Sequence, residues 1–66
     1  MLCRIYFTMK SEMTIEADTL DEAEHRMEQL KADAQSRCHH GEVITAQLRV
    51  RAQINGKHHW VTLETL

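Results

Sequence analysis

The sequence predicts an α+β domain of order ββαββ, in which one helix packs on one face of a four-stranded antiparallel sheet. Three observations predict this fold. Two pairs of segments alternate apolar and polar residues as strands do, a segment with helical spacing separates the pairs, and Asn55-Gly56 joins the last two segments. With 66 residues, 42% of them hydrophobic, the chain is expected to be a single domain, residues 1–66, with a thin core.

The first hairpin is expected from alternation in residues 2–9 and 13–17, separated by a polar turn at residues 10–12. Apolar side chains share one side of each segment: Cys3, Ile5, Phe7 and Met9 in the first, and Met13, Ile15 and Ala17 in the second. The opposite side of the first segment carries Arg4 and Tyr6. One side of this hairpin is therefore expected to face the core.

A helix is expected over residues 20–37. Thr19 and Glu22 have the spacing of a capping box, in which the Thr19 hydroxyl accepts from the Glu22 N–H and the Glu22 carboxylate accepts from the Thr19 N–H. Gly41 is suited to a left-handed turn after the helix. One apolar stripe recurs at helical spacing: Leu20, Ala23, Met27, Leu30 and Ala34.

The dipeptide Asn55-Gly56 predicts a type I′ turn, because both residues tolerate positive φ. The turn fixes the pairing of a strand from about Glu42 to Ile54 with a strand from Lys57 to Leu66. On the apolar side it pairs Ile54 with Lys57, Ala52 with His59, Val50 with Val61, and Leu48 with Leu63. On the polar side it pairs Gln53 with His58, Arg51 with Trp60, Arg49 with Thr62, and Gln47 with Glu64. The order 2-1-3-4 is preferred over 1-2-4-3, since a short connection through the helix places the third strand beside the first.

The polar side of the sheet is the candidate binding surface, with Arg4, Tyr6, Arg49, Arg51, His58 and Trp60 side by side. Tryptophan, tyrosine and arginine are enriched at the hot spots of protein interfaces. The same residues can stack on unpaired bases and hold phosphates. A third interpretation is a solvated face on which Arg51 stacks on Trp60 as a cross-strand pair. The net charge of −2 favours a protein partner over direct contact with nucleic acid.

The acidic half of the helix offers a different contact surface. Five carboxylates fall within eleven residues: Asp18, Asp21, Glu22, Glu24 and Glu28. They could dock on a basic partner or imitate a phosphate backbone, although solvent faces of helices are commonly rich in glutamate.

Neither catalysis nor a metal is expected. Cys38, His39 and His40 follow the helix, and His58 and His59 are adjacent on a strand, where neighbouring side chains point to opposite faces. Their spacing matches no known zinc motif. Cys38 and His40 could pair as nucleophile and base, but no third group that would orient them is evident. We therefore expect a non-enzymatic protein without metal or cofactor.

The location expected from the sequence is the cytoplasm of a bacterial host cell. Two cysteines far apart, with no secretory segment, indicate reduced thiols. No run of apolar residues has the length of a membrane span, so no contact with a membrane is expected.

Several segments resemble small phage-encoded anti-CRISPR proteins that inhibit type I (I-F-like) surveillance complexes. The resemblance lies in residues 15–23, in the Cys38-His39-His40-Gly41 turn with the two residues after it, in Asn55-Gly56-Lys57 and in Trp60-Val61. It implies a helix against an antiparallel sheet and an inhibitor that prevents target DNA from pairing with the guide. It also implies that positive charge near the turn, here Arg37, contacts the partner. Glu24 and His25 stand where the family has basic residues.

The function expected is thus that of a phage or mobile-element inhibitor, either a monomer or a homodimer, that binds a type I CRISPR complex. The residues expected to bind the partner are Arg4, Tyr6, Arg37, Arg49, Arg51, His58 and Trp60. The alternative is a small prophage or plasmid regulatory module that dimerises through its sheet and binds protein or nucleic acid.

Overall fold

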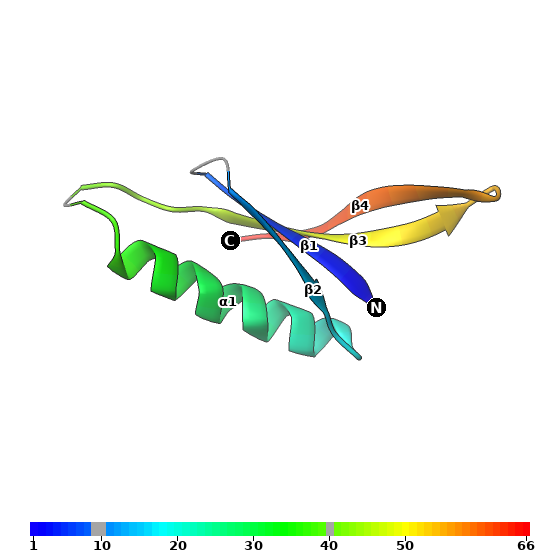
Figure 1. Cartoon of the computed structure of the whole chain (residues 1–66), viewed down its shortest axis with the longest axis horizontal. Helices are drawn as coiled ribbons and strands as arrows, with labels where there is room; N and C mark the ends of the chain where they lie inside the picture. Colours follow the sequence, from blue (N-terminus) through cyan, green and yellow to red (C-terminus); the bar gives the residue numbers. More distant parts are fainter. Residues whose placement is uncertain (9–10, 40) are drawn as a thin grey trace.

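The computed structural model describes residues 1–8, 11–39 and 41–66 and has the predicted ββαββ order (Figure 1). The elements are β1 (Leu2–Phe7), β2 (Glu12–Glu16), α1 (Leu20–Ser36), β3 (Ala46–Ile54) and β4 (Lys57–Thr65). The four strands form one antiparallel sheet of order β2-β1-β3-β4, which confirms the preferred order. Met9, expected to end the first strand, the turn residue Lys10 and His40 lie outside the described residues.

The core lies between α1 and one face of the sheet, because the apolar sides of β1 and β3 point toward the helix. Its largest fully buried side chains are Ile5, Met27, Ile44, Leu48 and Cys3. Phe7, Leu30, Val50 and Leu66 pack around this group and are partly buried. Leu20 and Met13, which the sequence placed on the apolar side of their elements, are 40% and 42% exposed at the margin of the layer.

The start of α1 is held as a capping box would hold it, with one difference. The Thr19 hydroxyl accepts from the Glu22 N–H at 3.1 Å, as predicted. The Glu22 carboxylate instead accepts from the Asp18 N–H at 3.0 Å, one residue before the predicted donor. Asp21 and Glu22 lie in the first turn, where negative charge stabilises the positive end of the helix dipole.

The hairpin of β3 and β4 turns where the sequence predicted. Asn55 has φ of 51° and Gly56 has φ of 79°, the positive values that a type I′ turn requires. The predicted pairs from Ile54 with Lys57 through Arg49 with Thr62 are all present. The turn therefore determines the register of the outer half of this hairpin.

A β-bulge makes the predicted register wrong beyond Arg49. Leu48 pairs with Glu64 rather than with Leu63, and Gln47 pairs with Thr65 rather than with Glu64. One extra residue in β4 reverses which side the following residues face. Because of this reversal Leu66, bonded to Ala46 through both backbone groups, packs against the core, while Leu63 is 42% exposed.

β3 begins four residues later than predicted, at Ala46 rather than near Glu42. The backbone before it is bonded to a helix side chain: Gln35 Nε2 donates to the Glu42 carbonyl at 2.6 Å, and Gln35 Oε1 accepts from the Ile44 N–H at 2.6 Å. Gly41, with φ of 92°, lies in a turn closed by the Glu42 N–H and the His39 carbonyl. The Gln35 side chain thus forms the hydrogen bonds with residues 42 and 44 that a neighbouring strand would otherwise form.

The outer half of the β3–β4 hairpin extends beyond the helix as an arm (Figure 1). The molecule measures 45 × 21 × 15 Å, and the Asn55-Gly56 turn lies at one end of the long axis. Apolar side chains on the arm stay accessible because no helix covers them: Ile54 is 48% and Val61 36% exposed.

Candidate functional site

Two arginines and two aromatic rings gather on the sheet face that α1 does not cover. Arg4 and Tyr6 come from β1, Arg49 from β3 and Trp60 from β4, so three neighbouring strands contribute. We call these four residues the arginine–aromatic surface. They share one side because β1 pairs Arg4 with Arg49, and because Trp60 lies on the side opposite that of the helix-facing residue Val61. All four are partly buried rather than fully solvated.

The surface is built from two stacked pairs. The Arg4 guanidinium carbon lies 4.2 Å from the centroid of the Trp60 ring, and that of Arg49 lies 4.7 Å from the centroid of the Tyr6 ring. Arg4 Nη1 also donates to the Tyr6 hydroxyl at 3.3 Å, which joins the two pairs. Arg49 Nε donates to Gln47 Oε1 at 3.1 Å, which fixes the plane of its guanidinium. Both guanidiniums are therefore held in defined positions rather than moving freely in solvent.

Neither arginine of this surface forms a salt bridge among the residues that the structure describes, although, after the hydrogen bond to Tyr6, the charge of Glu12 on β2 contributes to the raised pKa of Arg4. Within the described part of the chain the ion pair found joins Arg37 to Asp33 at 3.0 Å, on the helix. Arg4 and Arg49 stand directly opposite each other on β1 and β3, although like charges in that position destabilise a sheet. The hydrogen bond to Tyr6 raises the pKa of Arg4, so the group stays charged. Arg4 Nε is buried without a hydrogen-bond partner.

The stacking of Arg51 on Trp60, which one interpretation of the sequence proposed, is replaced by a stacking of Arg4 on the same ring. Arg51 is the cross-strand partner of Trp60, as predicted, but its side chain is exposed and Arg4 covers the ring instead. Arg4 lies on β1 and reaches across β3 to the indole. Sequence reasoning considered only the residue directly opposite Trp60, so it missed a contact between strands that are not neighbours.

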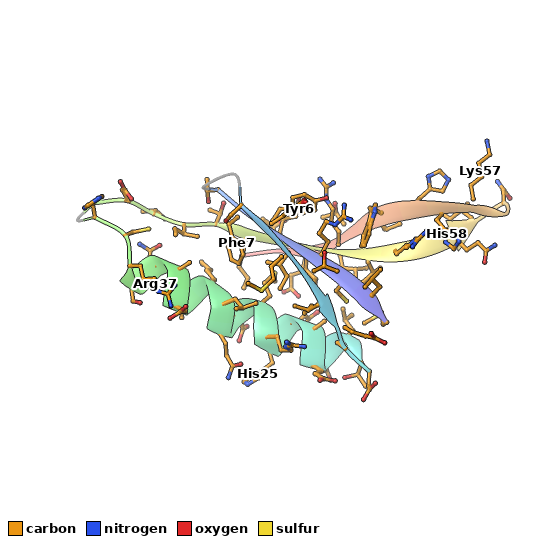
Figure 2. The ribbon with its side chains drawn as sticks, viewed as in Figure 1. Tyr6, Phe7, His25, Arg37, Lys57 and His58 are labelled. Carbon is orange, nitrogen blue, oxygen red and sulfur yellow. The ribbon has the colours of Figure 1, made fainter. Side chains whose placement is uncertain are left out.

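Two further residues predicted to bind the partner lie away from this surface (Figure 2). His58 is exposed near the tip of the arm, next to Lys57. Arg37 caps the end of α1 on the helix layer, where Asp33 neutralises it. The structure therefore brings Arg4, Tyr6, Arg49 and Trp60 together, with Arg51 beside them on the arm. It does not bring Arg37 or His58 to them.

The cysteines and histidines form no compact cluster among the residues that the structure describes. No group of three potential metal ligands meets in that part of the chain. Cys3 is buried under the helix, burial raises its pKa, and it forms no disulfide with Cys38. Burial and the nearby Glu42 carboxylate raise the pKa of Cys38, which lowers its thiolate fraction. His40, the base considered for Cys38, lies outside the described residues.

A cavity of about 380 Å³ lies beside α1, lined in part by Ala32, Gln35, Val43, Ile44 and Leu66. Four of its seven lining residues are apolar, and the polar ones are Glu28, Lys31 and Gln35 of α1. Glu28 is exposed, and both polar groups of Gln35 are already bonded to the backbone of residues 42 and 44. A small-molecule site normally adds a few converging polar groups to such a lining. The arginine–aromatic surface is thus the better candidate.

Comparison with known proteins adds no family: no family model, no curated protein and no solved structure matches the chain. The resemblance to anti-CRISPR proteins stays a prediction. The helix α1, in the part of the chain that the structure describes, is not long and apolar enough to cross a membrane.

Proposed function

We propose that this chain is a non-enzymatic binding protein that uses the arginine–aromatic surface to hold an acidic patch on a protein or ribonucleoprotein. The observation that carries the proposal is the pair of positioned guanidiniums, neither of which forms a salt bridge within the described part of the chain. Planar guanidiniums bind carboxylates or phosphates through two parallel hydrogen bonds, and less conformational entropy is lost when the side chain is already held. Partial burial of the rings supports a contact area at the centre of an interface.

The stacking also bears on the class of partner. One face of Trp60 and one face of Tyr6 are already covered by the protein's own arginines. Nucleic-acid platforms leave such ring faces open to bases. The acidic net charge of −2 further opposes attraction to long nucleic acids. A protein surface rich in carboxylates suits this geometry better than an unpaired strand.

The named partner that we favour is a type I CRISPR surveillance complex, in the cytoplasm of a bacterial host. This choice rests on the sequence resemblance alone, and the contact surface is proposed independently of it. In this proposal the protein acts as an inhibitor of phage or mobile-element origin that blocks recognition of target DNA. The regulatory module that dimerises through its sheet is the second candidate, and the exposed edge of β4 favours it.

Binding to a purified type I complex, measured by biolayer interferometry, tests the partner and the surface together. Arg49→Gln and Trp60→Phe are each expected to weaken binding by about 30-fold, which corresponds to about 2 kcal/mol at an interface anchor. Arg26→Gln, which removes an arginine from the helix, is the matched control and is expected to stay within about twofold.

Three results would count against parts of the proposal. If Arg49→Gln and Trp60→Phe bind like the wild type while Glu24→Lys abolishes binding, the acidic helix is the contact. If the wild type binds no type I complex, a pull-down from host lysate with the same variants tests the surface alone. A mobility shift with single-stranded DNA that Arg49→Gln removes would instead assign the surface to nucleic acid.

A further inference from the structure

β4 is an exposed edge strand with an uncovered apolar side. It pairs with β3 and ends the sheet, so one of its backbone edges has no strand beside it. The helix packs mainly on β1 and β3, which leaves Val61 and Leu63 of β4 36% and 42% exposed. Natural proteins protect such edges with charge, proline or shortness.

The two edges of this sheet differ in that protection. β2 has five residues and carries Glu12 and Glu16. β4 has nine residues, has no proline, and carries formal charge only at Lys57 near its start and Glu64 near its end. Its bulge, which also protects an edge, lies at Leu63 and leaves residues 57–62 in regular pairing. A long, nearly neutral edge beside exposed apolar side chains favours addition of another strand.

We propose that a second copy of this chain covers this edge, through antiparallel pairing of the two β4 strands with Val61 near the two-fold axis. The product is a continuous eight-stranded sheet. Its symmetry is isologous, so each contact occurs twice. This inference deepens the second candidate function, dimerisation through the sheet, and does not depend on the contact proposed for the arginine–aromatic surface.

Charge complementarity selects this occupant. In the antiparallel arrangement, the second copy's Lys57 and His59 fall on the helix side of the sheet, next to Glu64 of the first. Glu64 lies close to Glu24 of α1, and this proximity raises the pKa of Glu24. The carboxylates Glu24 and Glu64 of each copy thus lie near Lys57 of the other copy. A parallel arrangement would place Lys57 beside Lys57 and leave the carboxylates unmatched.

Pairing also changes the opposite face. Trp60 of one copy comes to lie across from Thr62 of the other, because both lie on the open side. The arginine–aromatic surfaces of the two copies then meet at the centre of one broad sheet. The contact is a single pair of edge strands, which is at the small end of specific interfaces, so dissociation constants of about 1–100 μM are expected.

Sedimentation velocity in reducing buffer, from about 5 to 500 μM protein, tests the inference. The wild type is expected to move from the mass of one chain, 7.7 kDa, toward twice that mass. Val61→Lys is expected to stay monomeric at every concentration, because it places two cations at the axis. Met13→Lys is the matched control, since Met13 on the other edge strand is 42% exposed against 36% for Val61, and it is expected to dimerise like the wild type.

A charge-swap experiment separates lost pairing from lost folding. Val61→Lys and Val61→Glu are each expected to be monomeric, and an equimolar mixture is expected to form a heterodimer at least tenfold more tightly than either forms a homodimer. A wild type that stays monomeric at 500 μM overturns the inference, as does a dimer that survives in both Val61 variants or is lost in Met13→Lys. Arg49 lies on β3, away from the paired edge, so the binding test on Arg49→Gln is independent of dimerisation and failure of one proposal is distinguishable from failure of the other.

Discussion

The stacking of Arg4 on Trp60 can be measured as a coupling energy. We expect Arg4→Met and Trp60→Leu to destabilise the protein by less in combination than the sum of the two single changes. The cation lies 4.2 Å from the ring centroid, and both side chains are partly buried. Cation–π pairs are worth about 0.5–1 kcal/mol when exposed and about 2 kcal/mol when desolvated, so a coupling near 1 kcal/mol is expected here.

The assay is urea unfolding of the four proteins in a double-mutant cycle. Unfolding is monitored by far-UV circular dichroism, because two of the variants lack the tryptophan that fluorescence would need. A domain of 66 residues has a free energy of unfolding of roughly 3–10 kcal/mol, so a coupling of about 1 kcal/mol is a measurable fraction. It corresponds to a change of about 4–8 °C in Tm for a domain of this size. Methionine keeps most of the arginine stem, which limits the loss of packing.

The control cycle combines Arg51→Met with Trp60→Leu. Arg51 is the direct cross-strand neighbour of Trp60 but does not cover its ring, so its coupling is expected to stay below about 0.5 kcal/mol. A larger coupling for Arg51 than for Arg4 would refute the geometry assigned to the arginine–aromatic surface.

Three further predictions concern stability. Leu48→Ala, at a fully buried site, is expected to cost about 2–5 kcal/mol by chemical unfolding, whereas Leu63→Ala at the bulge should cost under about 1 kcal/mol; equal costs would contradict the bulged register. Gly56→Ala is expected to cost about 1 kcal/mol because φ is 79°, and the conservative Lys57→Arg next to it should be neutral; a neutral Gly56→Ala would contradict the type I′ turn. The pKa of Glu24 is raised by the hydrogen bond with Glu64, by burial and by nearby carboxylates, so the folded protein binds this proton more tightly than the unfolded chain. The free energy of unfolding therefore increases as the pH falls through the folded pKa of Glu24, and this contribution is lost as the pH rises through that pKa. Glu24→Gln should flatten that slope between pH 7 and pH 4 in thermal melts, Glu16→Gln should leave it unchanged, and an unaltered slope in Glu24→Gln would exclude the carboxylate pair as its source.

Local signals accounted for most of the fold. Alternation located four strands, helical spacing and the Thr19 cap located α1, and positive φ at Asn55 and Gly56 fixed the outer register. These features depend on residues close in sequence, which is why they can be predicted.

The errors share a physical cause. The bulge at Leu63 and the late start of β3 depend on contacts between distant parts of the chain, namely Leu66 with the core and Gln35 with residues 42–44. No local composition marks either one. At the candidate site, the sequence located the open face with its arginines and rings, but not the reach of Arg4 across β3. A long side chain can contact a residue two strands away, and the rule that pairs directly opposite residues of neighbouring strands does not include such contacts.

The bulge also determines how substitutions in β4 should be interpreted. An unbroken strand would show one alternating pattern of tolerance to polar residues from Lys57 to Thr65. Here the pattern of tolerance should invert after Thr62, because Glu64 and Leu66 face the helix layer and Thr65 faces solvent. Deleting Leu63 would restore strict alternation to the strand and would leave Glu64, Thr65 and Leu66 on the sides that they face now, because Leu63 is the one residue of this segment without a partner on β3.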